Sequence, residues 1–359
     1  MSILIAIIIF AVIILIHEIG HFTAAKLFKM RVVSFNLGMG PVLLRKRGKE
    51  TAYQIKAVPF GGSVQLAEDD EDAAEKDPHV FRNKPVWQRA IVIMAGAFMN
   101  IVLGFILCLF IVNMNDSEMV DTVEIRGFRE GAASNHQLSA GDRITHINGM
   151  RIFTWADISY QFYNTETRMS ADADMAVFDF TVVRNGERAQ LNNVHFYARE
   201  LETGGKAIFL DFGVEWVDKT FFNVISRAAK ETLTYSRLVL LTLFDMIRGT
   251  YGLNDIAGPV GVVTVIGEVS SEGFERSIAE GIRSSLFMAA LITVNVGIFN
   301  LLPIPALDGG KLVFFAIEAV RRKPIKEEIE GMIHLVGFAA LMVFMLLITV
   351  LDIGRLFNS

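Results

Sequence analysis

The sequence lacks several features that would place it in other protein classes. It has a single cysteine, Cys108, which excludes an internal disulfide and leaves the redox surroundings open. It has no excess of positive charge, since 34 Lys and Arg face 39 Asp and Glu, a net charge of −5. It also contains no helix-turn-helix or RNA-binding signature. These absences argue against a nucleic-acid partner.

Apolar residues, in contrast, are abundant. They make up 52% of the 359 residues, and the mean hydropathy is +0.42. Such values are high for a soluble globular protein and predict a membrane protein. Four stretches are long and apolar enough to cross or enter a bilayer, and these are Ile3–Phe28, Arg89–Val112, Ser284–Leu302 and Met332–Leu351.

The first apolar stretch could also be a cleavable signal peptide. However, Met1 to Ile16 has no basic segment before it and no small-x-small cleavage site after it, and it leads directly into His17. We therefore expect a retained first span.

The segment between the first two spans, Arg31 to Gln88, alternates short strand-like runs with Gly and Pro. It predicts a compact β-hairpin element. The acidic run Glu68–Glu75 that follows is typical of a solvated loop. The expected strands are Val32–Asn36, Val42–Lys46, Ala52–Val58 and Ser63–Leu66.

A further region, from Asn113 to about Tyr197, is soluble in composition. Within it, Glu130 to Ile152 reads EGAASNHQLSAGDRITHINGMRI and resembles a PDZ domain. Such domains bind extended peptides by adding a strand to a sheet edge. A β-rich spacer without a ligand is the alternative. After it, Arg227–Arg248 predicts an amphipathic helix that lies at the membrane interface, with Leu238, Leu241, Phe244 and Ile247 along its apolar side.

The basic residues predict the topology. They cluster between spans one and two and again between spans three and four, where Arg321, Arg322, Lys323 and Lys326 lie. Loops rich in Lys and Arg remain in the cytoplasm. Both termini and the PDZ-like region are then expected on the far side.

The first span ends in His17-Glu18-Ile19-Gly20-His21, an HExxH pattern. On an α-helix, two histidines four residues apart share one face and can bind one zinc ion. Glu18 is then available as the general base that takes a proton from zinc-bound water. A helix-end cluster facing water is the alternative. It is disfavoured because an ionisable residue in a span costs about 2.5 to 3.5 kcal/mol on insertion scales.

A catalytic zinc normally has three protein ligands and one open position, so a third ligand must come from elsewhere in the chain. The third span ends in NLLPIPALDGG, residues Asn300 to Gly310. Its prolines and glycines predict irregular backbone, which is tolerated at membrane depth only when it is buried or lines a wet cavity. Asp308 is the natural third ligand. Its alternative role is to cap the helix that follows.

Together these segments resemble the site-2 protease family of intramembrane zinc metalloproteases, of the bacterial regulator-of-sigma-E-protease type. The resemblance covers most of the chain and includes the motifs HEIGH, GMGP, PFGGSV, FRNKPVWQRA, GPVG and NLLPIPALDGG. It implies His17, His21 and Asp308 as zinc ligands, Glu18 as catalytic base and Asn300 as a substrate-binding residue. Met39 and Ser63 depart from the family pattern, which affects expectations about substrate preference.

The same resemblance implies regulated proteolysis of single-span membrane proteins, of the anti-sigma-factor or signal-peptide-remnant type, in a bacterial inner membrane. Two other functions stay open from the residues alone: a catalytically silent PDZ-containing membrane adaptor, and a zinc transporter. None of the remaining histidines has ligand spacing, and these are His79, His136, His146, His195 and His334.

The expected fold is thus an α-helical polytopic membrane protein of about four spans, with a membrane-associated β-hairpin element and an inserted PDZ-like β-rich domain. The expected segments are a first membrane half at 1–112, a PDZ-like domain at 113–200, a connecting region with an amphipathic helix at 201–283, and a second membrane half at 284–359.

Overall fold

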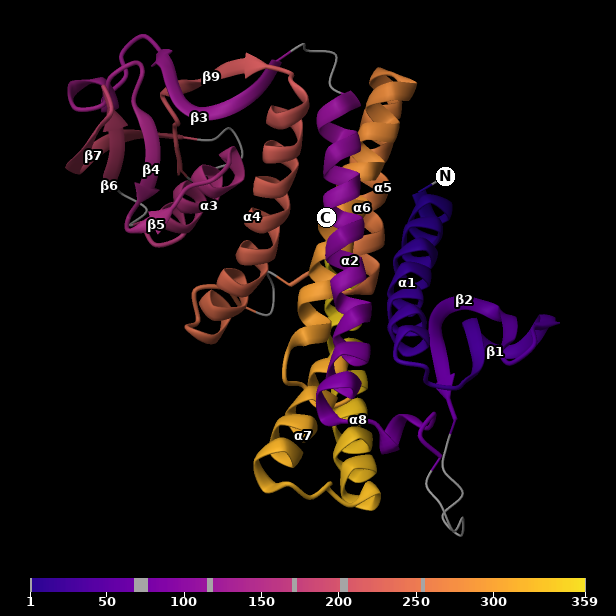
Figure 1. Ribbon diagram of the computed structural model, residues 1–359. Coiled ribbons are helices and arrows are strands. Elements are labelled where there is room, and N and C mark those ends of the chain that lie inside the picture. Colours follow the sequence, from indigo (N-terminus) through magenta and orange to yellow (C-terminus); the bar gives the residue numbers. More distant parts are fainter. Residues whose placement is uncertain are drawn as a thin grey trace. The chain divides into compact units, whose positions relative to one another are not determined.

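The computed structural model describes residues 2–67, 77–114, 119–169, 173–200, 206–252 and 256–358. The predicted acidic loop, Glu68–Glu75, lies outside these residues. The chain divides into two compact units, one made of residues 1–107 and 253–359 and the other of residues 108–252. Each unit is described by itself below (Figure 1).

Four helices are long and apolar enough to cross a membrane, which confirms the four predicted stretches. They are α1 (Ser2–Leu27), α2 (Val86–Met114), α6 (Ile278–Leu301) and α8 (Glu327–Asn358). The first unit also contains α5 (Pro259–Arg276), α7 (Asp308–Arg321) and the short 3-10 helix η1 (Phe81–Asn83).

Helices α5 and α6 form an antiparallel hairpin with a break at Ser277. The Ser277 hydroxyl accepts a hydrogen bond from the Glu280 amide at 3.0 Å and so caps α6. A Cβ at Gly273 or Gly281 would collide with the opposite helix. Small residues at these points allow the two backbones to approach closely. The hairpin packs against α1 through a cluster of buried apolar side chains, Ala6, Ile9, Ile13, Ile266, Met288, Ala289 and Ile292.

The GPVG motif begins α5, and a carboxylate of α8 closes this helix end. Asp352 is 3% exposed and accepts hydrogen bonds from the amides of Gly258 at 3.2 Å and Gly261 at 2.7 Å. A Cβ at Gly258 would lie 2.7 Å from the Asp352 carboxylate. The glycine therefore lets an acidic side chain reach amides that a helix start leaves without partners.

The predicted β-hairpin element is present as two long, bent strands, β1 (Val32–Arg47) and β2 (Ala52–Leu66). All four predicted strand segments lie within them. The first half of β1 pairs with both halves of β2, and the first half of β2 pairs with both halves of β1. The ladder is thus effectively four-stranded, with residues 62–66 along one edge and 42–47 along the other.

The second unit is β-rich. Among its described residues a sheet runs in the order β8-β7-β6-β4-β3-β9, and β5 pairs with β4. The sheet continues beyond residue 200, the expected end of the PDZ-like domain, because β8 and β9 belong to it. The strands are β3 (Met119–Phe128), β4 (Arg143–Ile147), β5 (Met150–Arg151), β6 (Met175–Arg184), β7 (Glu187–Glu200), β8 (Lys206–Ile208) and β9 (Phe212–Asp218); the helices are η2 (Ser134–His136), α3 (Trp155–Glu166) and α4 (Phe221–Ile247).

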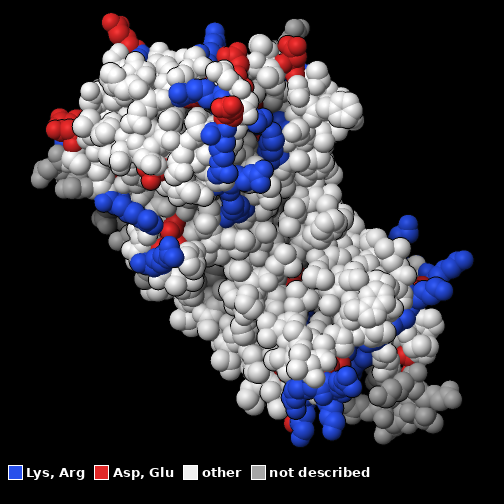
Figure 2. Space-filling model, turned by 60° about the vertical axis from the view of Figure 1, so that its left-hand side comes forward, with Lys and Arg blue, Asp and Glu red and all other residues white. Residues whose placement is uncertain are grey.

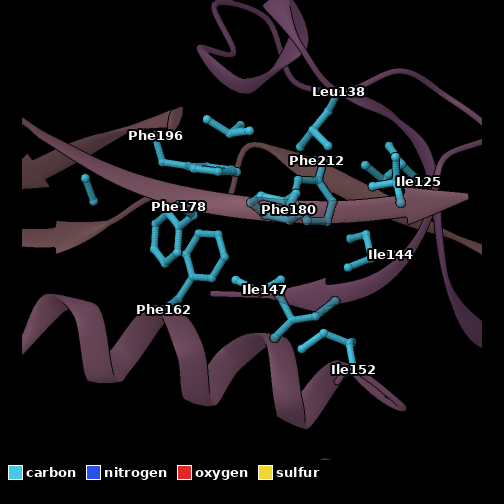
Figure 3. Close-up of a cluster of buried hydrophobic side chains, with 14 of the residues drawn as sticks. Ile125, Leu138, Ile144, Ile147, Ile152, Phe162, Phe178, Phe180, Phe196 and Phe212 are labelled. Carbon is cyan, nitrogen blue, oxygen red and sulfur yellow. The ribbon is translucent and has the colours of Figure 1, made fainter. Parts of the chain in front are cut away.

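The core of this unit combines phenylalanine rings with aliphatic side chains, as Figure 3 shows. Phe162 of α3 stacks on Phe178 of β6 with ring centroids 4.4 Å apart. Phe196 of β7 meets both rings edge to face. These geometries add to the stabilisation that comes from burial alone. These side-chain contacts hold α3 against the sheet, and they involve no contact with a membrane.

The predicted amphipathic helix is α4, and its polar side packs against α3. Asp157 of α3, fully buried, accepts hydrogen bonds from Thr234 at 3.0 Å and from Arg237. Asp245 of α4 accepts from Tyr160 and, at 3.2 Å, from Asn164. Other positions of α4 leave apolar side chains exposed, among them Leu233, Leu240, Phe244 and Ile247.

Basic residues gather at one end of the first unit. Figure 2 shows blue side chains at its lower end, where Figure 1 draws the connection from α7 to α8, and a largely uncharged surface along the helices above. Lys84 Nζ donates to the Phe28 carbonyl at 2.8 Å, so the loops after α1 and before α2 meet. Phe81 of η1 in turn contacts Phe315 of α7, with ring centroids 6.1 Å apart. The two basic loops therefore share one end of this unit, as the predicted topology requires.

Candidate metal centre

The three predicted ligands converge on one point. His17 Nε2 lies 3.1 Å and His21 Nε2 lies 3.2 Å from Asp308 Oδ2, and the two Nε2 atoms are 3.1 Å apart. Ligand atoms about 2.0–2.1 Å from a tetrahedral zinc are about 3.4 Å from one another. Asp308 Oδ2 is buried, and apart from the two imidazole nitrogens it has no polar partner among the described residues. Both the spacing and the donor set fit zinc.

Helix α2 positions both histidines through one stripe of residues four apart. His21 Nδ1 is 2.8 Å from the Val92 carbonyl oxygen, and His17 Nδ1 is 3.3 Å from the Asn100 amide. Between them, a Cβ at Gly96 would lie 2.4 Å from His21 Nε2. The glycine is required because the imidazole rings occupy the space where a side chain would be.

Glu18 lies between the metal ligands and the β1–β2 sheet. Its side chain is 9% exposed and accepts a hydrogen bond from the Val64 backbone. A Cβ at Gly62 would lie 2.6 Å from Glu18 Cγ. The edge strand at residues 62–66 thus runs directly past the predicted base, and Gly62 permits this approach.

The turn that carries Asp308 is held by α8. Ala306 adopts a left-handed conformation with φ of 77°, which a residue with a Cβ rarely takes. Its amide donates to His334 Nδ1 at 3.0 Å. One turn further along α8, a Cβ at Gly337 would lie 2.3 Å from the Pro305 side chain. Close contact and a hydrogen bond together fix the turn two residues before Asp308.

A cavity of about 960 Å³ opens from the metal centre toward α7 and α8. Arg89 and Glu318 form an ion pair in its wall. Asn300, predicted to bind substrate, is half-buried in the last turn of α6 and is not part of the lining. Residues that line the cavity include His17, Glu18, His21, Ser63, Val64, Arg89, Asp308, Lys311, Glu318, Glu330 and His334.

The sequence predicts the three ligands and Glu18, but it does not predict the residues that support them. Val92, Gly96 and Asn100 form no motif with HEIGH, since they lie on another helix. Their spacing of four in an apolar helix, with one Gly and one Asn, is the only signal the sequence offers. His334 was assigned no role, although it contacts the turn before Asp308.

A membrane helix bundle that presents two histidines, a carboxylate and an adjacent glutamate defines a membrane-embedded metallopeptidase centre. Comparison with known proteins agrees: the family model for peptidase family M50 matches residues 5–344. The chain belongs to this family, the site-2 proteases, and is a zinc metalloendopeptidase.

Relatives match along nearly their full length. A protein of Clostridium acetobutylicum, provisionally named a zinc metalloprotease, is 33% identical over 98% of this chain and 97% of its own length. Zinc metalloprotease RasP of Geobacillus kaustophilus is 28% identical over 99% of this chain and 98% of its own. The regulator of sigma-W protease RasP of Bacillus subtilis is 26% identical, covering 98% of each chain. The resemblance found in the sequence is confirmed.

Proposed function

We propose that this protein hydrolyses peptide bonds within the membrane-spanning segments of single-span membrane proteins, as a step in regulated intramembrane proteolysis. The observation that carries the proposal is the position of the metal centre. His17, Glu18 and His21 follow directly on an apolar run of α1, and Asp308 meets them from the start of α7, after the turn that follows α6. A substrate bond must therefore enter the bundle to reach them.

Each residue has a distinct task in the proposed reaction. His17, His21 and Asp308 would hold zinc, which would make a water more acidic and polarise the scissile carbonyl when bound. Glu18 would take a proton from the attacking water and deliver it to the leaving amine. Its hydrogen bond from the Val64 backbone holds the carboxylate in place between the two histidines and the sheet edge.

The substrate segment is proposed to bind as a strand. A helix hides its peptide bonds in its own hydrogen-bond ladder, so cleavage requires local unwinding. The edge strand at residues 62–66 offers new partners beside Glu18. Because antiparallel pairing alternates, Gly62, Val64 and Leu66 direct their backbone groups away from β1, and the Val64 contact with Glu18 supports this. Asn300 is proposed to hold the strand from the opposite side through its amide.

The β-rich unit is proposed to be a PDZ-like gate on the extracytoplasmic side of a bacterial inner membrane. Strand β9 ends the sheet, with no second neighbour among the described residues, which supports peptide binding by strand addition. In this proposal the gate excludes substrates that still carry a bulky outer domain. The basic loops support the orientation, because one of them precedes α2 in the chain whereas the β-rich unit follows α2.

Family resemblance and the sigma-W regulator named among the relatives together suggest substrates. We propose anti-sigma-factor-like proteins with one span, or remnants of signal peptides. Both present a short hydrophobic helix without a large folded domain at its outer end.

The test compares membrane-protein fragments in cells that carry wild-type protein, Glu18→Gln or a control, Glu275→Gln, whose carboxylate is exposed on α5. Truncated single-span proteins should accumulate only with Glu18→Gln. Identical fragment patterns in all three strains would contradict the proposal.

A further inference from the structure

Asn100 stands out because it is polar, fully buried and incompletely partnered. It is 0% exposed, and its Oδ1 has no hydrogen-bond partner among the described residues. Its Nδ2 lies 3.3 Å from His17 Nδ1. A buried amide with an unused acceptor costs free energy unless some state of the protein uses it.

The metal centre explains why Asn100 keeps an unused acceptor. When His17 Nε2 binds zinc, the remaining proton of the neutral ring is on Nδ1, which becomes a donor. A donor cannot pair with the amide Nδ2. A half-turn of the Asn100 amide exchanges its two atoms and brings the unused Oδ1 toward Nδ1. Amide orientation is an assignment made from the hydrogen-bond network, and the network here changes when the metal binds.

The surroundings fix Asn100 for this task. Thr293 of α6 donates to the Asn100 backbone carbonyl at 3.1 Å, and Gly297 allows α6 to pack over the Asn100 Cβ. Two residue positions of α2 thus serve the two histidines: the Val92 carbonyl for His21 and the side chain at 100 for His17. A backbone carbonyl cannot be changed by mutation, so Asn100 is the point where this support can be tested.

We propose that Asn100 is a positioning residue of the zinc site, whose side-chain oxygen accepts the Nδ1 proton of His17 and fixes the ring for metal binding. This inference rests on the proposed assignment of His17 as a ligand. Groups that orient metal-bound histidines typically change metal affinity by about 10- to 100-fold when they are removed.

The experiment measures zinc affinity of the full chain in detergent by competition with a chelator. Asn100→Leu, similar in size but without an acceptor, should bind zinc about 10- to 100-fold more weakly than wild type. Asn100→Asp, which keeps an oxygen acceptor, should bind at least as tightly as wild type. Phe98→Leu, an exposed neighbour on α2, should leave affinity unchanged. The absorption bands of the cobalt-substituted protein should shift in Asn100→Leu only.

Equal zinc affinity of wild type and Asn100→Leu would overturn the inference, and so would an Asn100→Asp variant as weak as Asn100→Leu, since packing alone would then explain the effect. If Asn100→Leu does not fold, Asn100→Asp is compared with wild type directly, and weaker zinc binding by Asn100→Asp overturns the inference. The His17→Ala variant distinguishes a failure of the His17 ligand assignment from a failure of the role of Asn100. Zinc retained in His17→Ala contradicts the ligand assignment itself, whereas zinc lost there but kept in Asn100→Leu contradicts only the role of Asn100.

Discussion

At the scale of single residues, the proposed assignment divides the four groups of the metal centre into three ligands, His17, His21 and Asp308, and one base, Glu18. Glu18 is not part of the cluster of candidate ligand atoms that His17, His21 and Asp308 form. Glu18→Gln should therefore abolish peptide cleavage while zinc stays bound. His17→Ala, His21→Ala and Asp308→Ala should each lower zinc occupancy. Metal analysis of the purified variants measures this, and undiminished zinc in all three ligand variants would refute the assignment.

His334 makes a second prediction at this scale. The left-handed turn at Ala306 is a strained conformation that costs about 1–3 kcal/mol, and it persists only if its surroundings hold it. His334→Ala removes the acceptor of the Ala306 amide and should weaken zinc binding and slow cleavage. His334→Asn, which can still accept a hydrogen bond, should recover part of both.

The matched control is His79→Ala. His79 Nδ1 likewise contacts a backbone group, but this group is the Lys29 carbonyl, 2.8 Å away in the loop after α1. Its zinc affinity in the same chelator assay should equal that of wild type. A His334→Ala variant with normal zinc affinity would show that the turn is held by packing at Gly337 alone.

At the scale of elements, the sheet edge carries a prediction about substrate binding. A proline placed in Ala52–Val58 would disturb an interior segment, because these residues pair on both sides up to Ile55. The Leu66→Pro variant tests the sheet edge more directly. It removes one outward amide at the edge and, since a net hydrogen bond contributes about 0.5–1.5 kcal/mol, should slow cleavage a few-fold with zinc retained.

Leu66→Ala is the control, since it shortens the same side chain but keeps the amide. Cleavage rates should separate the two variants on a substrate whose span is stably helical. Helix-breaking residues in the substrate span should reduce the difference. Equal rates for the proline and alanine variants would contradict strand pairing at this edge.

A further element-scale prediction concerns the capped start of α5. Asp352→Ala leaves the Gly258 and Gly261 amides without their acceptor, and loss of such a cap typically costs about 0.5–2 kcal/mol. The apparent unfolding temperature in detergent should fall, while zinc affinity is kept. Val350→Ala, exposed on the same helix, should unfold like wild type. An unchanged unfolding temperature in Asp352→Ala would mean that water satisfies these amides.

At the scale of the whole molecule, the β-rich unit should restrict which substrates reach the metal centre. The deletion suggested by the sequence, Ser117–Tyr197, would cut through the sheet, because β8 and β9 belong to it. Replacing residues 117–218 by a flexible linker removes the sheet completely. Cleavage of single-span substrates that keep their outer domain should then increase, as detected by immunoblotting.

The same deletion combined with Glu18→Gln should show no cleavage, which ties the new activity to the metal centre. Full-length substrates that stay uncut by the deletion variant, while pre-shortened substrates are cut normally, would contradict the gating role.

Much of this protein could be read from local pattern. The four apolar helices follow from runs of residues that only a bilayer or a core can accommodate. HEIGH specifies a shared helix face because a spacing of four is nearly one helical turn. The strand segments between Val32 and Leu66 are punctuated by Gly and Pro, and the polar and apolar sides of α4 are visible in its periodicity. These signals concern residues close together in the chain.

What only the tertiary structure decided are the contacts between segments far apart. Packing places Val92, Gly96 and Asn100 of α2 around the two histidines. It also places the edge strand at residues 62–66 beside Glu18, and His334 beside the turn that precedes Asp308. It also turned the polar side of α4 toward α3. Periodicity says which face of an element is apolar or polar, but which other element covers that face depends on shapes and hydrogen bonds that form only when the chain is folded.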